Sequence, residues 1–187
     1  MREDRLTPGQ VTGPTIQRLQ DELSAWIERQ FANWQSVRLA GPKVIRDPIH
    51  QFIRLEPHEV GVLDTPIVQR LRHIHQTALT FLVYPGANHS RLEHSLGTLS
   101  SAQSMLEAIA WTQQLDERIR VHVRLAALLH DVGHVLFSHL GESVLAERFP
   151  EVARGLQDEP YHGQPRFFGE AAVGEALAYL IINSPPF

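Results

Sequence analysis

The 187-residue sequence contains no cysteine, which excludes disulfide bonds and thiolate metal ligands and fits a reducing compartment such as the cytoplasm. It also lacks any run of about 18 apolar residues, so we expect no membrane-spanning helix. Residues 1–5 are charged and lead into no apolar segment, which argues against a secretory signal. The formal net charge of -4 argues against broad binding to nucleic acid but leaves a local basic groove open. Any metal site in this chain must therefore use histidine and carboxylate ligands.

Hydrophobic residues make up 43% of the chain, enough for the core of one domain with an appendage. Residues 1–13 are polar with proline and glycine, so we expect a loose tail. Apolar residues at helical spacing predict an amphipathic helix over 15–34, with Thr15 as its N-cap. Its tryptophans and phenylalanine pack either on the same domain or on a second copy, as a dimerisation arm. We therefore expect a tail and helical arm over 1–40 and a main domain over 41–187.

The main domain is predicted to be all-α, apart from one small β-hairpin over 44–55 around Asp47-Pro48. Asp64 is the expected N-cap of the helix that follows, and Gly133 the expected end of a later, mostly buried one. Residues 79–84 are expected to be an extended connector and residues 151–166 a loop. The apolar spacing predicts helices over 66–77, 91–111, 117–130, 140–149 and 167–183.

Candidate metal ligands come from two of these helices. His130 and Asp131 are adjacent at the end of an apolar helix, and His94 lies on the preceding helix. Neighbouring side chains diverge by about 100° around a helix, but they converge on one ion that sits over the helix end. Two imidazoles and one carboxylate suit Fe, Mn, Zn, Co or Ni better than Mg alone, and three ligands leave positions for water and substrate. Such a site activates water to attack a phosphate ester or anhydride.

Further polar residues cluster around these ligands in the sequence. Arg91 precedes His94 by three residues, so a guanidinium on the same helix face could clamp phosphate oxygens. His134 and His139 follow closely, and either could protonate a leaving oxygen or orient the water. Taken singly, a helical histidine or a His-Asp pair is ordinary. The interpretation therefore depends on the combination within residues 91–139.

The sequence resembles the HD-domain superfamily of metal-dependent phosphohydrolases, and most closely its deoxynucleoside triphosphate triphosphohydrolase (dGTPase-like) branch. Four blocks carry this resemblance in family order: Lys43–His50, Asp64–Arg72, Pro85–Gly97, and Leu129–His134 with Phe137–His139. The resemblance implies a helical HD bundle that hydrolyses a dNTP to the deoxynucleoside and inorganic triphosphate.

The same resemblance implies roles for individual residues. It assigns His94, His130 and Asp131 to a divalent metal, Arg91 to phosphate, and His134 and His139 to catalysis. It assigns Gln76 to the substrate sugar. Asp64, Gln69 and Arg72 are similar to residues that read a guanine nucleotide at an allosteric site between subunits, so a homo-oligomer is also implied.

Two departures from the family pattern matter. The family's fourth metal ligand is an aspartate well downstream of the HD pair, and we expect this 187-residue chain to end before that segment; Asp158 is not a substitute. Gly169-Glu170 also stands where the family often has His-Glu, and His162 could compensate only if its loop folds back. A noncatalytic nucleotide-binding module therefore stays open as an alternative. A generic HD phosphodiesterase is disfavoured by the Asp64–Arg72 block.

Overall fold

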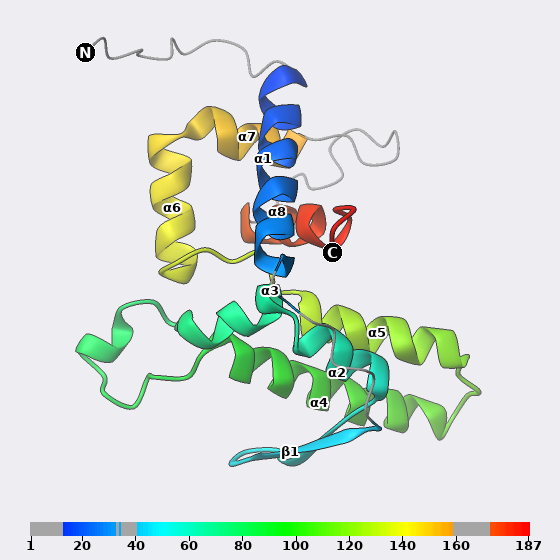
Figure 1. Cartoon of the computed structure of the whole chain (residues 1–187). Coiled ribbons are helices and arrows are strands. Elements are labelled where there is room, and N and C mark those ends of the chain that lie inside the picture. Colours follow the sequence, from blue (N-terminus) through cyan, green and yellow to red (C-terminus); the bar gives the residue numbers. More distant parts are fainter. Residues whose placement is uncertain (1–12, 33, 35–40, 159–172) are drawn as a thin grey trace, which may run out of the picture.

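The computed structural model describes residues 13–32, 34, 41–158 and 173–187. These residues form eight α-helices, two short 3-10 helices and one two-stranded antiparallel sheet, which confirms the predicted all-α fold with a small hairpin. Figure 1 shows α4 and α5 side by side above the hairpin, with α1 running past α6, α7 and α8. None of the described helices combines the length and the apolar character that a membrane crossing requires.

The hairpin forms where the sequence predicts it. Strand β1 (Lys43–Asp47) pairs with β2 (Gln51–Leu55), so that Ile45 lies opposite Ile53. The Asp47 carboxylate accepts hydrogen bonds from the backbone of Ile49 at 2.8 Å and of His50 at 2.7 Å, which closes the turn. Ile53 and Leu55 are buried against the helices.

The segment after the hairpin differs from the prediction. Helix α2 (Pro57–Leu63) was not expected, and Asp64 ends it rather than capping the next helix. Thr65 is the N-cap of α3 (Pro66–Gln69), which continues only as a 3-10 helix, η1 (Arg70–His73). The chain leaves the helical conformation there because the Ile74 carbonyl accepts a hydrogen bond from the distant Arg91 backbone at 2.8 Å. The predicted extended connector is also wrong, since Thr80–Leu82 form a second 3-10 helix, η2.

Helices α4 (Arg91–Ala110) and α5 (Glu117–Leu129) pack side by side and carry the candidate ligands. Ser90 and Glu93 form a reciprocal capping box that fixes where α4 begins. Asp116 caps α5 by accepting a hydrogen bond from the Arg118 backbone at 2.9 Å. The expectation that α5 is buried on most sides is wrong, because the apolar residues Ile119 and Val123 are 48% and 39% exposed.

The C-terminal helices are α6 (Ser138–Arg148), α7 (Pro150–Asp158) and α8 (Val173–Ile182). Helix α7 replaces the first part of the predicted loop, and Ala153 packs there with apolar residues of α8. Gly133 does not end α5, which stops at Leu129. A Cβ at Gly133 would instead collide with the backbone of Gly174 and Ala178, so this glycine permits close approach of α8.

Helix α1 (Gly13–Phe31) begins before Thr15, which is therefore not its N-cap, and it ends before Trp34. Ile27 is fully buried in the main core, and Leu23, Trp26 and Phe31 pack around it. The helix thus packs on its own domain, the first of the two alternatives. The predicted boundary between residues 40 and 41 adjoins a segment outside the described residues and stays a prediction.

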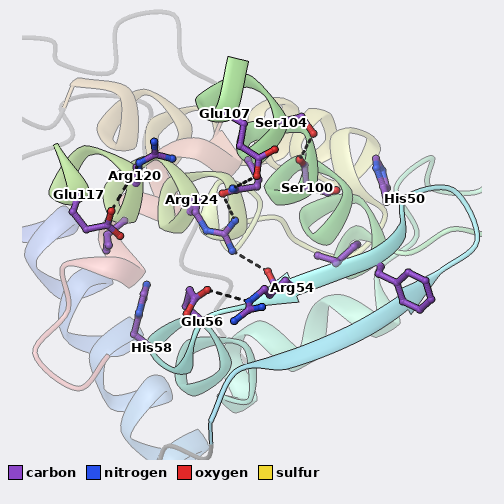
Figure 2. Close-up of a pocket in the computed structure, with 14 residues that line it drawn as sticks. His50, Arg54, Glu56, His58, Ser100, Ser104, Glu107, Glu117, Arg120 and Arg124 are labelled. Atoms are coloured by element: carbon purple, nitrogen blue, oxygen red, sulfur yellow. Dashed lines mark hydrogen bonds and ion pairs between the residues drawn. The ribbon is translucent and has the colours of Figure 1, made fainter. Parts of the chain in front are cut away.

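A pocket lies between the hairpin, α4 and α5 (Figure 2). Arg124 lies at its base, and its Nε and Nη2 each donate to one carboxylate oxygen of the buried Glu59 at 2.7 Å. Its Nη1 donates to Gln103 at 2.6 Å, and Nη2 also donates to the Arg54 carbonyl at 2.9 Å. No residue assigned to a site from the sequence lines this pocket.

Candidate metal and active site

The imidazoles of His94 and His130 face each other across the α4–α5 interface. His94 lies in the first turn of α4, and His130 is the C-cap of α5. Their Nε2 atoms are 3.3 Å apart. His130 Nδ1 lies 2.9 Å from the Ala127 carbonyl oxygen, so a proton on Nδ1 leaves the Nε2 lone pair free. Burial lowers the pKa of His94, with help from the charges of His130 and Arg91, which favours the neutral form that binds metals.

Asp131 completes the group. Its Oδ1 lies 3.3 Å from His130 Nε2, and its Oδ2 lies 3.9 Å from His94 Nε2. One donor atom from each of the three residues falls within 4.8 Å of the others. Two imidazole nitrogens bound tetrahedrally to one ion at about 2.0–2.1 Å would lie roughly 3.3 Å apart. The donors therefore fit a single divalent transition metal.

Arg91 lies behind this group rather than in solvent. Its Nη1 donates to Asp131 Oδ2 at 2.7 Å, and its Nε donates to the Ser138 hydroxyl at 2.9 Å. Ser138 in turn donates to the His75 carbonyl at 2.7 Å. Burial alone would raise the pKa of Asp131. Hydrogen bonds from His134 and Arg91, with the charge of His130, outweigh that effect and hold the pKa far below its usual range.

A chain of hydrogen-bonding groups leads from Asp131 to the surface. His134 Nε2 lies 3.1 Å from Asp131 Oδ1, and its Nδ1 contacts Glu142. Burial would lower the pKa of His134, but the bonds to Asp131 and Glu142 outweigh it and raise that pKa. The other Glu142 oxygen lies 3.2 Å from Nδ1 of His139, whose side chain is 71% exposed. Asp131, His134, Glu142 and His139 thus form one connected path.

Sequence reasoning missed Glu142. The signal was its position three residues after His139 on a predicted helix, which places both side chains on one face. His134, His139 and Glu142 also lie close enough together to hold a cation. However, both ring nitrogens of His134 already meet carboxylates, an arrangement that favours the imidazolium ion over a metal ligand.

Helices α4 to α7, with the turn between α5 and α6, lie within a segment that matches a known family. Residues 91–165 match the family model described as HD domain. This stretch of the chain is therefore similar to HD domains. The candidate ligand His94 lies near the start of that segment, and His130 and Asp131 lie near its middle.

The chain is also similar to several curated proteins. The chain is 50% identical over 97 residues to the uncharacterized protein MJ1154 of Methanocaldococcus jannaschii, covering 52% of this chain and 20% of that protein. It is 44% identical over 115 residues to the deoxynucleoside triphosphate triphosphohydrolase SAMHD1 of Homo sapiens, covering 60% and 18%. A SAMHD1 homolog of Dictyostelium discoideum is 40% identical over 104 residues, covering 54% and 20%. The chain therefore spans about a fifth of the length of these relatives.

The residues predicted to bind nucleotide outside the metal group lie in two places. The side-chain oxygen of Gln76 is buried without a partner among the described residues, and its backbone N–H donates to the His89 carbonyl at 3.0 Å. Gln69 donates to the Leu63 carbonyl at 2.7 Å and accepts from Arg72 Nε at 2.6 Å. The neighbouring Asp64 pairs with Lys43 at 2.8 Å, a partner that sequence reasoning did not assign to this site.

Four positions named from the sequence lie outside the part that the structure describes. They are His162, Gly169, Glu170 and the side chain of Asp158.

Proposed function

We propose that this chain is a metal-dependent phosphohydrolase that converts a dNTP to the deoxynucleoside and inorganic triphosphate. The observation that carries the proposal is the 3.3 Å separation of the His94 and His130 Nε2 atoms, with the Asp131 carboxylate beside both. The name of the Homo sapiens relative supports this substrate class. MJ1154 is an uncharacterized protein, so it indicates no substrate.

His94, His130 and Asp131 would hold a divalent ion of Fe, Mn, Zn, Co, Ni or Mg. When bound, such an ion supplies Lewis acidity and lowers the pKa of nearby water. The rest of the chemistry comes from the protein. His94 and His130 are about 40% and 38% exposed in their side chains, so a phosphate can reach the group. Arg91 keeps its Nη2 without a partner among the described residues, as a donor for a phosphate oxygen.

In the proposed reaction a water oxygen bonds to the α-phosphorus and releases a proton to the solvent, and the bond from that phosphorus to the 5′-oxygen breaks. The leaving 5′-oxygen needs a proton. His139 can donate it, because Glu142 holds its Nδ1 and leaves Nε2 as the unbound ring nitrogen. His134, between Asp131 and Glu142, can replenish the proton through Glu142.

The Arg91–Asp131 ion pair favours one alternative, a nucleotide-binding module without turnover. The guanidinium already neutralises the carboxylate that a metal ion would otherwise attract. Such a module would use the same group of His94, His130, Asp131 and Arg91 for sensing or assembly. We also propose that Asp64, Gln69 and Arg72, together with Lys43, bind a guanine nucleotide between subunits of a homo-oligomer.

The test incubates the purified full chain with each of the four dNTPs and Mn²⁺, followed by chromatography. Deoxynucleoside plus triphosphate is the expected result, and cyclic nucleotides should stay intact. Intact dNTP with a measurable dissociation constant would instead support the binding module. His139→Ala should abolish turnover. His122→Ala is the matched control, since it removes an exposed histidine from the first half of α5, eight positions before His130.

A further inference from the structure

The turn that follows the metal-ligating pair is held by an arginine from a distant part of the chain. Arg70, in η1, donates through Nη1 to the His134 carbonyl at 2.8 Å. Its Nη2 donates to the Val132 carbonyl. One planar guanidinium thus binds two carbonyl oxygens on either side of Gly133, and a charged donor makes both bonds strong.

This turn determines where two site residues lie. Asp131 immediately precedes Val132, and the His134 backbone N–H donates to the Asp131 carbonyl at 3.1 Å. The His134 side chain then returns to Asp131 Oδ1 at 3.1 Å. A rotation of either peptide that Arg70 binds would therefore move the carboxylate, the imidazole or both.

Arg70 is itself held by the N-terminal helix. Its guanidinium carbon lies 5.9 Å from the centre of the Trp26 ring, within cation–π range. Trp26 packs against the main core beside the fully buried Ile27. Burial lowers the pKa of Arg70, but a guanidinium stays protonated near neutral pH. The contacts therefore run from α1 through Trp26 and Arg70 to the turn.

The other side of the turn leaves little room for adjustment. The backbone of α8 comes so close to Gly133 that a single added Cβ would collide with it. The turn is thus held between Arg70 and α8. Arg70 lies next to Gln69, but its side chain makes none of the contacts of the proposed allosteric group.

We propose that Arg70 is a positioning residue that holds the Val132–His134 turn so that Asp131 and His134 keep their places in the site. Because Arg70 packs on Trp26, the position of its guanidinium depends in turn on the packing of α1. The inference rests on the proposed metal-dependent function, because only then does the placement of Asp131 govern an activity. Among the described residues, the hydrogen bonds of the Arg70 side chain go to backbone carbonyls of the turn, so its effect passes through the backbone.

The test compares Arg70→Met, Arg70→Lys and Trp26→Leu with the unsubstituted full chain. Arg118→Met is the matched control, because it removes an exposed arginine of α5 by the same substitution. Co²⁺ affinity is measured by competition with a chelator, and thermal unfolding shows which variants are folded. Arg70→Met should weaken Co²⁺ binding about tenfold, the lower end of the range for residues that support ligands. Arg70→Lys should be intermediate, because one ammonium cannot span both carbonyls.

A second measurement does not need a metal. Amide hydrogen exchange of residues 132–135 should be faster in metal-free Arg70→Met than in Arg118→Met, with exchange in the centre of α4 unchanged. Trp26→Leu should accelerate the same amides, and it decides the question if Arg70→Met does not fold. Native-like exchange in the turn, or Co²⁺ affinity within twofold of native in folded Arg70→Met, overturns the inference. Failure of the unsubstituted chain to bind Co²⁺ would instead overturn the proposed function, and hydrogen exchange would still decide the role of Arg70.

Discussion

Arg91 Nη1 lies 2.7 Å from Asp131 Oδ2, and the two side chains are only 1% and 5% exposed. A buried carboxylate that loses its guanidinium partner keeps too little compensation for its charge in a poorly solvated place, even with His134 beside it. Arg91 therefore acts on the candidate site before any nucleotide arrives, and this ion pair leads to the first prediction.

Arg91→Met should lower the free energy of unfolding by about 3–5 kcal/mol, the usual loss when one partner of a buried pair is removed. The double variant Arg91→Met/Asp131→Leu should lose less than the sum of the two single variants, because it leaves no unpaired charge. Urea denaturation of the metal-free chains measures all four free energies. Additive losses would show that the pair is energetically uncoupled.

Gly174→Ala tests how closely α8 supports the site. The added Cβ would lie 2.8 Å from His134 Nδ1 and would also meet the Glu142 carboxylate. We expect a loss of about 1–3 kcal/mol in the free energy of unfolding, typical of overpacking, with turnover reduced about tenfold. Gly41→Ala is the control, because nothing lies within 4 Å of its Cβ position. Equal behaviour of the two variants would argue against the packing of α8 on His134.

Glu142→Gln tests the path from His134 to His139. The substitution keeps the shape of the side chain but removes the charge that both imidazoles face. Turnover should fall about a hundredfold, as for loss of acid–base assistance, while Co²⁺ affinity stays within a few-fold. Steady-state kinetics and metal titration of the same preparation provide the two values. A large loss of metal affinity with little change in turnover would contradict this role and would assign Glu142 to metal binding instead.

The stability of the metal-free chain should depend on pH in two windows. The folded-state pKa of Asp131 lies below its ordinary value of 3.8, so its contribution is present above 3.8 and is lost as the pH falls further. The folded-state pKa of His134 lies above 6.5, so its contribution is complete below 6.5 and is lost as the pH rises through the higher value. Melting temperatures across this range should therefore decline on the alkaline side. That decline should be weaker in His134→Gln. A decline as large as in the unsubstituted chain would contradict the raised pKa of His134.

Local signals explain most of what the sequence predicted correctly. Ser90 and Glu93 lie three residues apart and fix the start of α4 without help from the rest of the chain. The Asp47 carboxylate likewise closes the hairpin, because it accepts hydrogen bonds from the backbone of residues two and three positions along the chain. The motif also places His94 on one helix and His130 and Asp131 at the end of the next, and the α4–α5 packing brings them together.

Contacts between distant residues explain the failures. The helix predicted over 66–77 stops early because the Ile74 carbonyl pairs with Arg91, a contact that no local pattern encodes. Helix α7 was missed because its support comes from α6, α8 and α1. The Arg70 contacts join residues more than 60 positions apart, and the Arg91–Asp131 pair joins residues 40 positions apart. Neither could be recognised without the packed structure.

Metal stoichiometry tests the central claim most directly. The full chain, reconstituted with Co²⁺ and freed of excess ion, should retain one ion per chain, while His94→Ala, His130→Ala and Asp131→Ala should each lose it. The exposed-histidine variant His122→Ala should keep it. Unchanged stoichiometry in His130→Ala, with the protein still folded, would contradict the account, because the two imidazoles 3.3 Å apart could then not share an ion.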